Sequence, residues 1–276
     1  MYQNQKIPVG ATLCGRPSMW SPKHVIAPRM WSPKHVVAPH MWSPQMIAKI
    51  PKNMTHALTA QLFDLQHSLA APLLERVDYP WHALPLIGAY IQELVAQLPK
   101  DYVQIAPQVW VGEGTYIEKT ALIQGPAIIG RNCQIRHAAF IREQVIIGDE
   151  VVVGNSTELK NAILFDGVQV PHFNYVGDSI MGYRAHLGAG AILSNFKSTG
   201  DEINVYLEGK KMGTGLNKFG ALVADHVEIG CNAVLFPGTI VGRGAVIYPL
   251  CPVRGFVEAG STLKNDGLIY PRVERD

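Results

Sequence analysis

A large apolar side chain recurs at every sixth position over two long stretches of the chain. The positions with this spacing are Val111, Ile117, Ile123, Ile129, Ile135, Ile141, Ile147, Val153, Leu159 and Phe165, and then Val223, Ile229, Leu235, Val241, Ile247 and Val253. A smaller side chain such as Ala, Val, Thr or Cys stands two residues before most of them. Since neither an α-helix nor a flat sheet has a period of six, the pattern predicts a repeating coil with flat faces.

The predicted fold class is all-β: a single-stranded left-handed parallel β-helix of the hexapeptide-repeat type. Each six-residue repeat would form one short strand, and three repeats would form one triangular coil. The large residue would point inwards, and the glycines that follow it, such as Gly112, Gly130 and Gly148, suit the tight turns between faces. In a coil of this kind each turn is supported by its neighbours.

The interruptions of the six-residue pattern predict how the rest of the chain is organised. An 11-residue motif begins at Met19, Met30 and Met41 and carries too many prolines for a helix. The expected segments are a disordered, Pro-rich basic arm at 1–55, a helical cap over the first coil at 56–100 with helices at 56–77 and 83–98, the β-helix at 101–267 with a loop insertion at 195–217 and a hairpin turning at Glu208-Gly209, and a tail at 268–276.

Composition narrows the classes of protein that the chain can represent. Residues 1–63 contain seven Lys or Arg and no Asp or Glu, so the remainder is mildly acidic, which argues against a nucleic-acid-binding face. No segment approaches the ~20 apolar residues of a membrane span. The four cysteines lack the CxxC spacing of metal sites. We therefore expect a cytoplasmic protein with no metal, no membrane partner and no nucleic-acid partner.

Arg142 and Lys160 each follow a large residue of the repeat and stand eighteen residues apart. Three repeats make one coil, so the two cations should stack on the same corner. Two cations held together favour an anion between them, and a phosphate suits a guanidinium fork beside an ammonium. The alternative is that each forms a local ion pair, for example with Glu143 or Glu158.

His172 lies twelve residues after Lys160, where the repeat is interrupted. A histidine with a pKa near neutrality can take a proton from an attacking amine. We expect its ring beside the notch formed by the two cations. The alternative is an exposed or structural histidine, as most of the ten histidines of the chain must be.

The residues between the repeats resemble a known family. The matching positions are Arg142, VGNSTELK at 153–160, HFNYVGD at 172–178, HLGAG at 186–190, Asn195 and NKF at 217–219. They are similar to the C-terminal acetyltransferase domain of the bacterial bifunctional UDP-N-acetylglucosamine pyrophosphorylase/glucosamine-1-phosphate N-acetyltransferase. The resemblance to that domain covers residues 139–195 and 217–245, and residues from about 62 to 255 resemble more closely the short stand-alone relatives of the domain.

The resemblance implies a role for each matching position. His172 would be the general base that deprotonates the amine of the acceptor. The residues implied to bind the sugar phosphate are Arg142, Lys160, Tyr175, His186, Asn195 and Lys218, and those implied to bind the cofactor are Ala189, Cys231 and Pro249. His186, Cys231 and Pro249 replace an asparagine, a serine and an alanine of the family. A backbone N–H near Ala189 would stabilise the oxyanion.

The predicted function is acetyl-CoA-dependent N-acetyl transfer to an amino-sugar phosphate, by a homotrimer with sites between subunits. Nucleotidyltransferase activity is not expected, since residues 1–100 contain no Gly-rich phosphate loop. One alternative is a non-catalytic protein that binds a sugar phosphate or nucleotide sugar. Another is an assembly subunit that docks through the Pro-rich arm. A metal-dependent anhydrase would need three suitably spaced histidines, and only His172 and His186 fall near the expected site.

Overall fold

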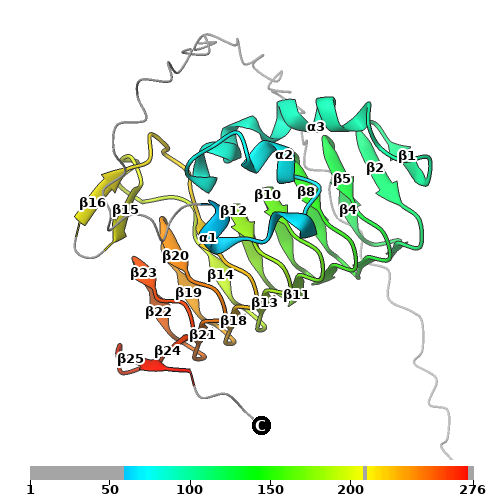
Figure 1. Ribbon diagram of the computed structural model, residues 1–276. Helices are drawn as coiled ribbons and strands as arrows, with labels where there is room; N and C mark the ends of the chain where they lie inside the picture. The colour runs from blue at the N-terminus through cyan, green and yellow to red at the C-terminus, as the bar shows by residue number, and fades with distance from the viewer. Residues whose placement is uncertain (1–58, 208–209, 273–276) are drawn as a thin grey trace, which may run out of the picture. The chain divides into compact units, whose positions relative to one another are not determined.

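The computed structural model describes residues 59–207 and 210–272, and these contain a left-handed parallel β-helix (Figure 1). The predicted fold class is therefore confirmed. The predicted arm at 1–55, the hairpin turn at Glu208-Gly209 and the last four residues of the tail lie outside the described residues.

Three columns of parallel strands form the faces of the β-helix, which we name A, B and C in the order in which the chain meets them. Face A contains β2 (Val109–Gly112), β5 (Ala127–Ile129), β8 (Val145–Ile147), β17 (Ala221–Val223), β20 (Thr239–Val241) and β23 (Phe256–Val257). Face B contains β3 (Tyr116–Ile117), β6 (Gln134–Ile135), β9 (Val152–Asn155), β11 (Gln169–His172), β13 (His186–Leu187), β18 (Glu228–Ile229), β21 (Val246–Ile247) and β24 (Ser261–Leu263). Face C contains β4 (Leu122–Ile123), β7 (Phe140–Ile141), β14 (Ile192–Leu193), β19 (Val234–Leu235) and β22 (Pro252–Val253).

Two longer strands, β10 (Glu158–Leu164) and β12 (Tyr175–Met181), run from face C into face A. The large residues of the repeat stack inside the prism as predicted: Ile141 pairs with Leu159, and both are fully buried. Phe165 is an exception, because the residue that pairs with Ile147 is Leu164. The prediction that Phe165 continues the inward column is therefore wrong by one position.

The shift of the inward column by one residue, from Phe165 to Leu164, arises at the turns between faces C and A. Three residues separate β7 from β8, whereas Lys160 and Asn161 alone carry the chain from the face C part of β10 to its face A part. Asn161 and, one coil later, Asp178 both adopt φ of +46°. Asn and Asp tolerate this left-handed conformation better than most residues, so a two-residue turn becomes possible. The coils that pass through them contain seventeen residues instead of eighteen.

The helical segment covers face A. It consists of α1 (Thr59–Leu62), the 3-10 helix η3 (Leu65–His67), α2 (Ala71–Leu74), the 3-10 helix η4 (Pro80–Leu86) and α3 (Ile87–Val95). These helices lie across the face A strands (Figure 1), with Phe63 against Phe165 at 5.2 Å and Trp81 against Phe219 at 5.9 Å between ring centroids. The expected position, over the open end of the first coil, is therefore wrong. That end carries β1 (Tyr102–Ala106), which pairs antiparallel with β2.

The outward side chains of face A explain this position. Successive residues of a strand point to opposite sides, so the middle residue of each three-residue face A strand points out of the prism. On face A these outward residues are Ile128, Ile146, Ile163, Ile180, Leu222 and Ile240, and all are fully buried. The corresponding residues of face B include Gln134, Gln169 and Glu228, which are exposed. Face A, unlike face B, therefore needs an apolar cover.

The insertion leaves the β-helix after β14 and forms a hairpin. Its strands, β15 (Asn204–Leu207) and β16 (Lys210–Gly213), pair antiparallel. At the other end of the chain, β25 (Ile269–Pro271) pairs antiparallel with β24. Among the described residues, the structure contains no helix with both the length and the apolar character that crossing a bilayer requires.

Candidate active site

Arg142 and Lys160 occupy the same edge of the prism, where face C turns into face A. Ile141 pairs with Leu159, and the N–H of Arg142 donates a hydrogen bond to the carbonyl of Leu159 at 2.8 Å. The two cations are therefore neighbours in consecutive coils, as their spacing predicts. We call this column of turns the C–A edge; its later members are Gly177, Ser194, Phe236 and Arg254.

The guanidinium of Arg142 already has anionic partners in this chain. It lies 3.1 Å from Glu158 and 3.8 Å from Glu143, which is the alternative that the sequence left open. The hydrogen bond with Glu158 raises the pKa of Arg142 above its usual range. For the ammonium of Lys160 the structure records no acceptor among the described residues. A phosphate here would bind Lys160 directly and share Arg142 with a carboxylate.

Tyr175 and Asn195 close the outer side of this edge. The Tyr175 hydroxyl lies 2.5 Å, and the Asn195 amide nitrogen 2.7 Å, from the position that a Cβ atom on Gly177 would take. Gly177 is thus required for the two side chains to approach the backbone. Burial raises the pKa of Tyr175, and the nearby Asp178 carboxylate raises it further. Tyr175 therefore acts near neutral pH as a hydrogen-bond donor and acceptor, without charge.

Asp178 is a buried carboxylate beneath these residues that the sequence analysis did not single out. Its two oxygens accept hydrogen bonds from the side-chain amides of Asn161, at 2.8 Å, and Asn195. It is only 5% exposed. Its place in the HFNYVGD motif was visible in the sequence, but nothing in the spacing indicated that it orients Asn195.

Lys218 returns to the C–A edge at the end of the insertion. The next residue, Phe219, donates its N–H to the carbonyl of Asn195 at 3.0 Å, and Gly220 donates to the carbonyl of Asp178 at 2.8 Å. Lys218 is exposed. The structure therefore brings five of the six predicted substrate residues to one edge: Arg142, Lys160, Tyr175, Asn195 and Lys218.

His186 is the exception among these six. It begins β13 on face B, and its Nδ1 lies 2.8 Å from a carboxylate oxygen of Glu228. Both residues line a shallow hollow of about 460 Å³ on this face together with Gln169 and Arg184. Within a single chain His186 therefore lies apart from the other five predicted substrate residues.

His172 lies on a different edge of the prism from Arg142 and Lys160. It ends β11 on face B and pairs with Asn155, and its exposed side chain has no recorded partner among the described residues. The expected notch, with the ring beside both cations, is thus absent within one chain. The reason is the spacing of twelve residues from Lys160, which carries the chain past two of the three faces.

The predicted cofactor residues share the edge of His172. The carbonyl of His172 accepts the N–H of Gly190 at 3.0 Å, that of Ala189 accepts Asn232 at 2.9 Å, and that of Cys231 accepts Leu250 at 2.9 Å. These hydrogen bonds link the residues of one column in consecutive coils: His172, Ala189, Cys231 and Pro249. We call this column the B–C edge. For the N–H of Ala189 no acceptor is recorded among the described residues.

Within the part of the chain that the structure describes, no three His, Cys, Asp or Glu side chains converge in a way that could hold a metal ion.

Fold and repeat together define a hexapeptide-repeat protein of the left-handed β-helix class. The family model described as the GMPPB C-terminal domain matches residues 123–209. A bifunctional sugar-1-phosphate nucleotidylyltransferase/acetyltransferase from Sulfurisphaera tokodaii is 32% identical over 198 residues, which are 68% of this chain and 48% of that protein. A bifunctional protein GlmU from Methanococcus maripaludis is 29% identical over 71% of this chain and 48% of that protein.

These matches confirm the resemblance predicted from the sequence: the chain is a relative of bifunctional nucleotidylyltransferase/acetyltransferases. It spans about half the length of the curated relatives that it matches. Among solved structures, WeeI from Acinetobacter baumannii AYE is 19% identical with a TM-score of 0.33, over 67% of this chain and 68% of that chain.

Proposed function

We propose that the protein transfers the acetyl group of acetyl-CoA to the amine of an amino-sugar phosphate. The observation that carries this proposal is the division of the predicted residues between two edges, with phosphate-type cations on the C–A edge and the histidine column on the B–C edge. The S. tokodaii relative is named as an acetyltransferase acting beside a sugar-1-phosphate nucleotidylyltransferase. The non-catalytic alternative is therefore not favoured.

On the C–A edge, the acceptor would be held through its phosphate. Arg142, Lys160 and Lys218 supply the positive charge, and a bidentate guanidinium fixes the orientation of a phosphate better than an ammonium does. Tyr175 and Asn195 supply neutral hydrogen bonds to the sugar. These contacts orient the acceptor through its phosphate and its sugar. The amine itself forms no ion pair with them and stays free to react.

On the B–C edge, the reaction itself would take place. As the general base, the ring of His172 would remove a proton from the amine as the amine nitrogen forms a bond with the thioester carbonyl carbon. The N–H of Ala189 donates a hydrogen bond to the oxyanion. When the carbonyl re-forms, the carbon–sulfur bond breaks, and the proton that His172 took from the amine is returned to the sulfur, so that coenzyme A leaves as its thiol. Cys231 and Pro249 would line the path of the pantetheine arm.

Two copies of the chain are needed to combine these functions. The phosphate residues and His172 lie on different edges of one prism, so the B–C edge of one subunit would face the C–A edge of the next. Such a heterologous contact generates a ring if its rotation closes. We propose a homotrimer with three equivalent sites.

The free, unpaired cysteines among the described residues support a cytoplasmic location.

Replacement of His172 by alanine tests the proposal. With acetyl-CoA and glucosamine 1-phosphate, the purified full chain should release coenzyme A, and His172→Ala should lower turnover by roughly 10²–10⁴-fold. Calorimetric binding of glucosamine 1-phosphate should remain. His137→Ala is the matched control, since His137 lies in an ordinary repeat, where its Nδ1 forms a hydrogen bond of 2.7 Å with the hydroxyl of Thr120. An unchanged rate in His172→Ala would show that His172 is not the general base. The absence of acetyl transfer in the wild type would refute the proposed function.

A further inference from the structure

A column of polar side chains lies beneath the C–A edge and takes one residue from each of three consecutive coils: Asn161, Asp178 and Asn195. Asn161 is 9% and Asp178 5% exposed, and Asn195 is half-buried. Asp178 forms no recorded ion pair with another described residue. Its two oxygens instead accept one amide N–H each, from Asn161 at 2.8 Å and from Asn195. A carboxylate withdrawn from water without a countercharge costs free energy, so a neutral side chain would be the more stable choice here unless the charge serves the site.

The carboxylate fixes which way the Asn195 amide points. Both carboxylate oxygens act as acceptors, so Asn195 presents its nitrogen to Asp178 and keeps its own oxygen on the other side. Asn195 also shares a hydrogen bond with the hydroxyl of Tyr175. Burial and the charge of Asp178 raise the pKa of Tyr175, whereas this hydrogen bond lowers it, which is the effect of an N–H directed at the hydroxyl oxygen. The two N–H groups of the amide are therefore committed to Asp178 and Tyr175.

This chain of hydrogen bonds leaves one acceptor and one donor for a ligand. Since both of its N–H groups are used, Asn195 can offer only its carbonyl oxygen. The Tyr175 oxygen already receives an N–H, so its own hydrogen points away from Asn195, and for this O–H no acceptor is recorded among the described residues. A sugar hydroxyl both donates and accepts hydrogen bonds, so it suits this pair of groups.

We propose that Asp178 is a positioning residue for the acceptor: by holding the Asn195 amide, it makes Asn195 accept a hydrogen bond from the sugar and Tyr175 donate one to it. Asp178 itself touches no substrate. The inference rests on the proposed function, which makes the ligand an amino-sugar phosphate. It adds that the sugar must bring both a donor and an acceptor to this edge, as a free hydroxyl does. A sugar without such a group binds more weakly, because the two protein groups stay unpaired.

Electrostatic repulsion alone predicts the opposite effect for this carboxylate. A negative charge near the cations of Arg142 and Lys160 opposes the binding of a phosphate, so its removal would strengthen binding. A positioning role predicts that its removal weakens binding, because the Asn195 amide becomes free to turn. The sign of the change in affinity therefore distinguishes the two effects.

Calorimetric titration of the full chain with glucosamine 1-phosphate, without acetyl-CoA, measures this sign. Asp178→Ala should weaken binding about tenfold, the effect of about one hydrogen bond, and Asn195→Ala should do the same. The double variant should bind at most about twofold more weakly than Asn195→Ala, because Asp178 acts through that amide. Tighter binding by Asp178→Ala, or losses that multiply in the double variant, would overturn the proposal.

Two further variants separate positioning from a general loss of stability. Asp178→Asn should stay within about threefold of the wild type, since its oxygen can still accept the N–H of Asn195. Its own N–H group then faces Asn161, whose buried Oδ1 has no partner in the described part of the chain. Asp225→Ala removes another buried carboxylate, which accepts two backbone N–H groups at the junction with the helices, and should leave the affinity unchanged. An equal loss in Asp225→Ala, or a loss in Asp178→Asn as large as that in Asp178→Ala, would contradict the assigned role.

Hydrogen exchange of the Asn195 side-chain amide tests the chain of hydrogen bonds without a ligand. In the wild type both N–H protons are bonded, so NMR of ¹⁵N-labelled protein should show slow exchange, and the resonances are identified by their loss in Asn195→Ala. Asp178→Ala and Tyr175→Phe should each accelerate the exchange of one proton about tenfold, because each removes one acceptor. Rapid exchange of both protons in the wild type would overturn the proposal.

Failure of this inference and failure of the proposed function give different results. If the wild type binds glucosamine 1-phosphate and the losses multiply, Asp178 loses the positioning role while the proposed function stands. If the wild type binds no glucosamine 1-phosphate, the proposed function fails, and the exchange of the Asn195 protons still decides whether Asp178 holds the amide.

Discussion

At the scale of single residues, the B–C edge contains the exposed thiol of Cys231, whereas the other two cysteines among the described residues are buried. Cys231 is exposed, whereas Cys133 and Cys251 are each 1% exposed. Burial raises the pKa of Cys133 to about 11 and also raises the pKa of Cys251. A thiol reacts as its thiolate, so the two buried cysteines are protonated as well as shielded near pH 8.

Thiol labelling therefore reports on the proposed cofactor column. In the native protein at pH 8 we expect Cys231 to be modified rapidly, and Cys133 and Cys251 only after unfolding. Saturating coenzyme A should slow modification of Cys231 at least tenfold, because the proposed pantetheine path covers it. Peptide mass spectrometry identifies the modified residue, and Cys231→Ser is the control. Equal labelling rates with and without coenzyme A would place the cofactor elsewhere.

Gly177 is the residue that makes the C–A edge accessible to Tyr175 and Asn195. Gly177→Ala would place a Cβ atom 2.5 Å from the Tyr175 hydroxyl and 2.7 Å from the Asn195 amide nitrogen, so both side chains must move. Loss of about one hydrogen bond should weaken glucosamine 1-phosphate roughly tenfold in calorimetry. Gly88→Ala in α3 is the control, since its nearest neighbour would be a side chain at 3.4 Å. An unchanged affinity would exclude Tyr175 and Asn195 from acceptor binding.

At the scale of elements, the carboxylate of Asp225 joins the helices to the β-helix. Asp225, which is 2% exposed, accepts the N–H of Asp64 at 2.7 Å and that of Tyr183 at 2.8 Å, and it pairs with Arg243 at 3.3 Å. Burial raises the pKa of Asp225 despite these partners. The folded protein thus takes up a proton at a higher pH than the unfolded chain does.

The sign of the pH effect follows from linkage. As pH rises from the ordinary aspartate pKa through the raised folded value, the folded state loses a proton that the unfolded state has already lost, and stability falls. We therefore compare the free energy of unfolding in urea of the wild type with that of Asp225→Asn. The wild-type value minus the variant value should be larger at pH 4.5 than at pH 7.5. Asp101→Asn is the control: Arg131 lowers the pKa of Asp101, so its effect lies below this window. A difference that grows with pH would contradict the raised pKa.

The hexapeptide pattern was sufficient to predict the β-helix because each coil repeats the same inward side chains. The position of the helices was also encoded, since Ile128, Ile146 and Ile163 place an apolar residue on the outside of face A in successive coils. These outward apolar residues recur only once in each coil, so they do not show in the six-residue pattern of inward positions. The two-residue turns at Asn161 and Asp178 were not predictable, because a left-handed φ at a non-glycine residue depends on the neighbouring coil.

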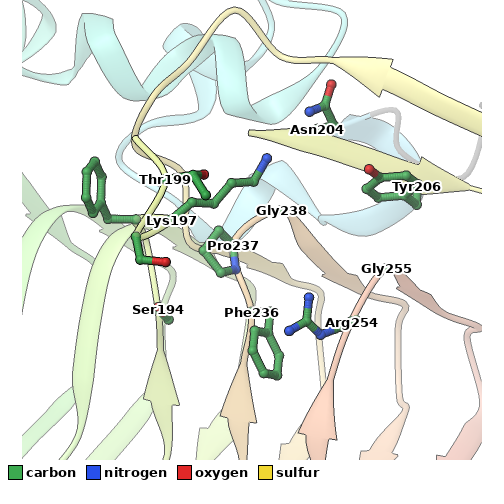
Figure 2. A pocket seen from close by; sticks show the side chains of 12 residues that line it. Ser194, Lys197, Thr199, Asn204, Tyr206, Phe236, Pro237, Gly238, Arg254 and Gly255 are labelled. Atoms are coloured by element: carbon green, nitrogen blue, oxygen red, sulfur yellow. The ribbon is translucent and has the colours of Figure 1, made fainter. Parts of the chain in front are cut away.

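The site could be predicted only in part. The spacing of Arg142 and Lys160 gave their common edge, because eighteen residues make one regular coil. His172 was misplaced because motif residues that are close in the sequence were assumed to be close in one chain. A hollow of about 540 Å³ between the insertion and the C–A edge (Figure 2) had no sequence signal, since its walls come from β15 and from turns that lie far apart along the chain.

At the scale of the whole molecule, the two edges predict that variants can complement each other. His172→Ala and Arg142→Ala should each be nearly inactive alone. If the subunits are unfolded, mixed in equal amounts and refolded together, about a quarter of the sites should combine an intact His172 with an intact Arg142 from the neighbour. Acetyl transfer should recover to about that fraction. Mixing folded proteins without subunit exchange is the control, and no recovery after joint refolding would contradict a shared site.

The helical layer on face A also restricts how such subunits could assemble. A surface already occupied by Phe63, Trp81 and their neighbours is not available to a second β-helix. Any ring of these prisms must therefore direct its helices away from the central axis and use the bare faces B and C for contact. Variation in the helical segment could then alter the outer surface of such an assembly while the proposed sites between subunits stay intact.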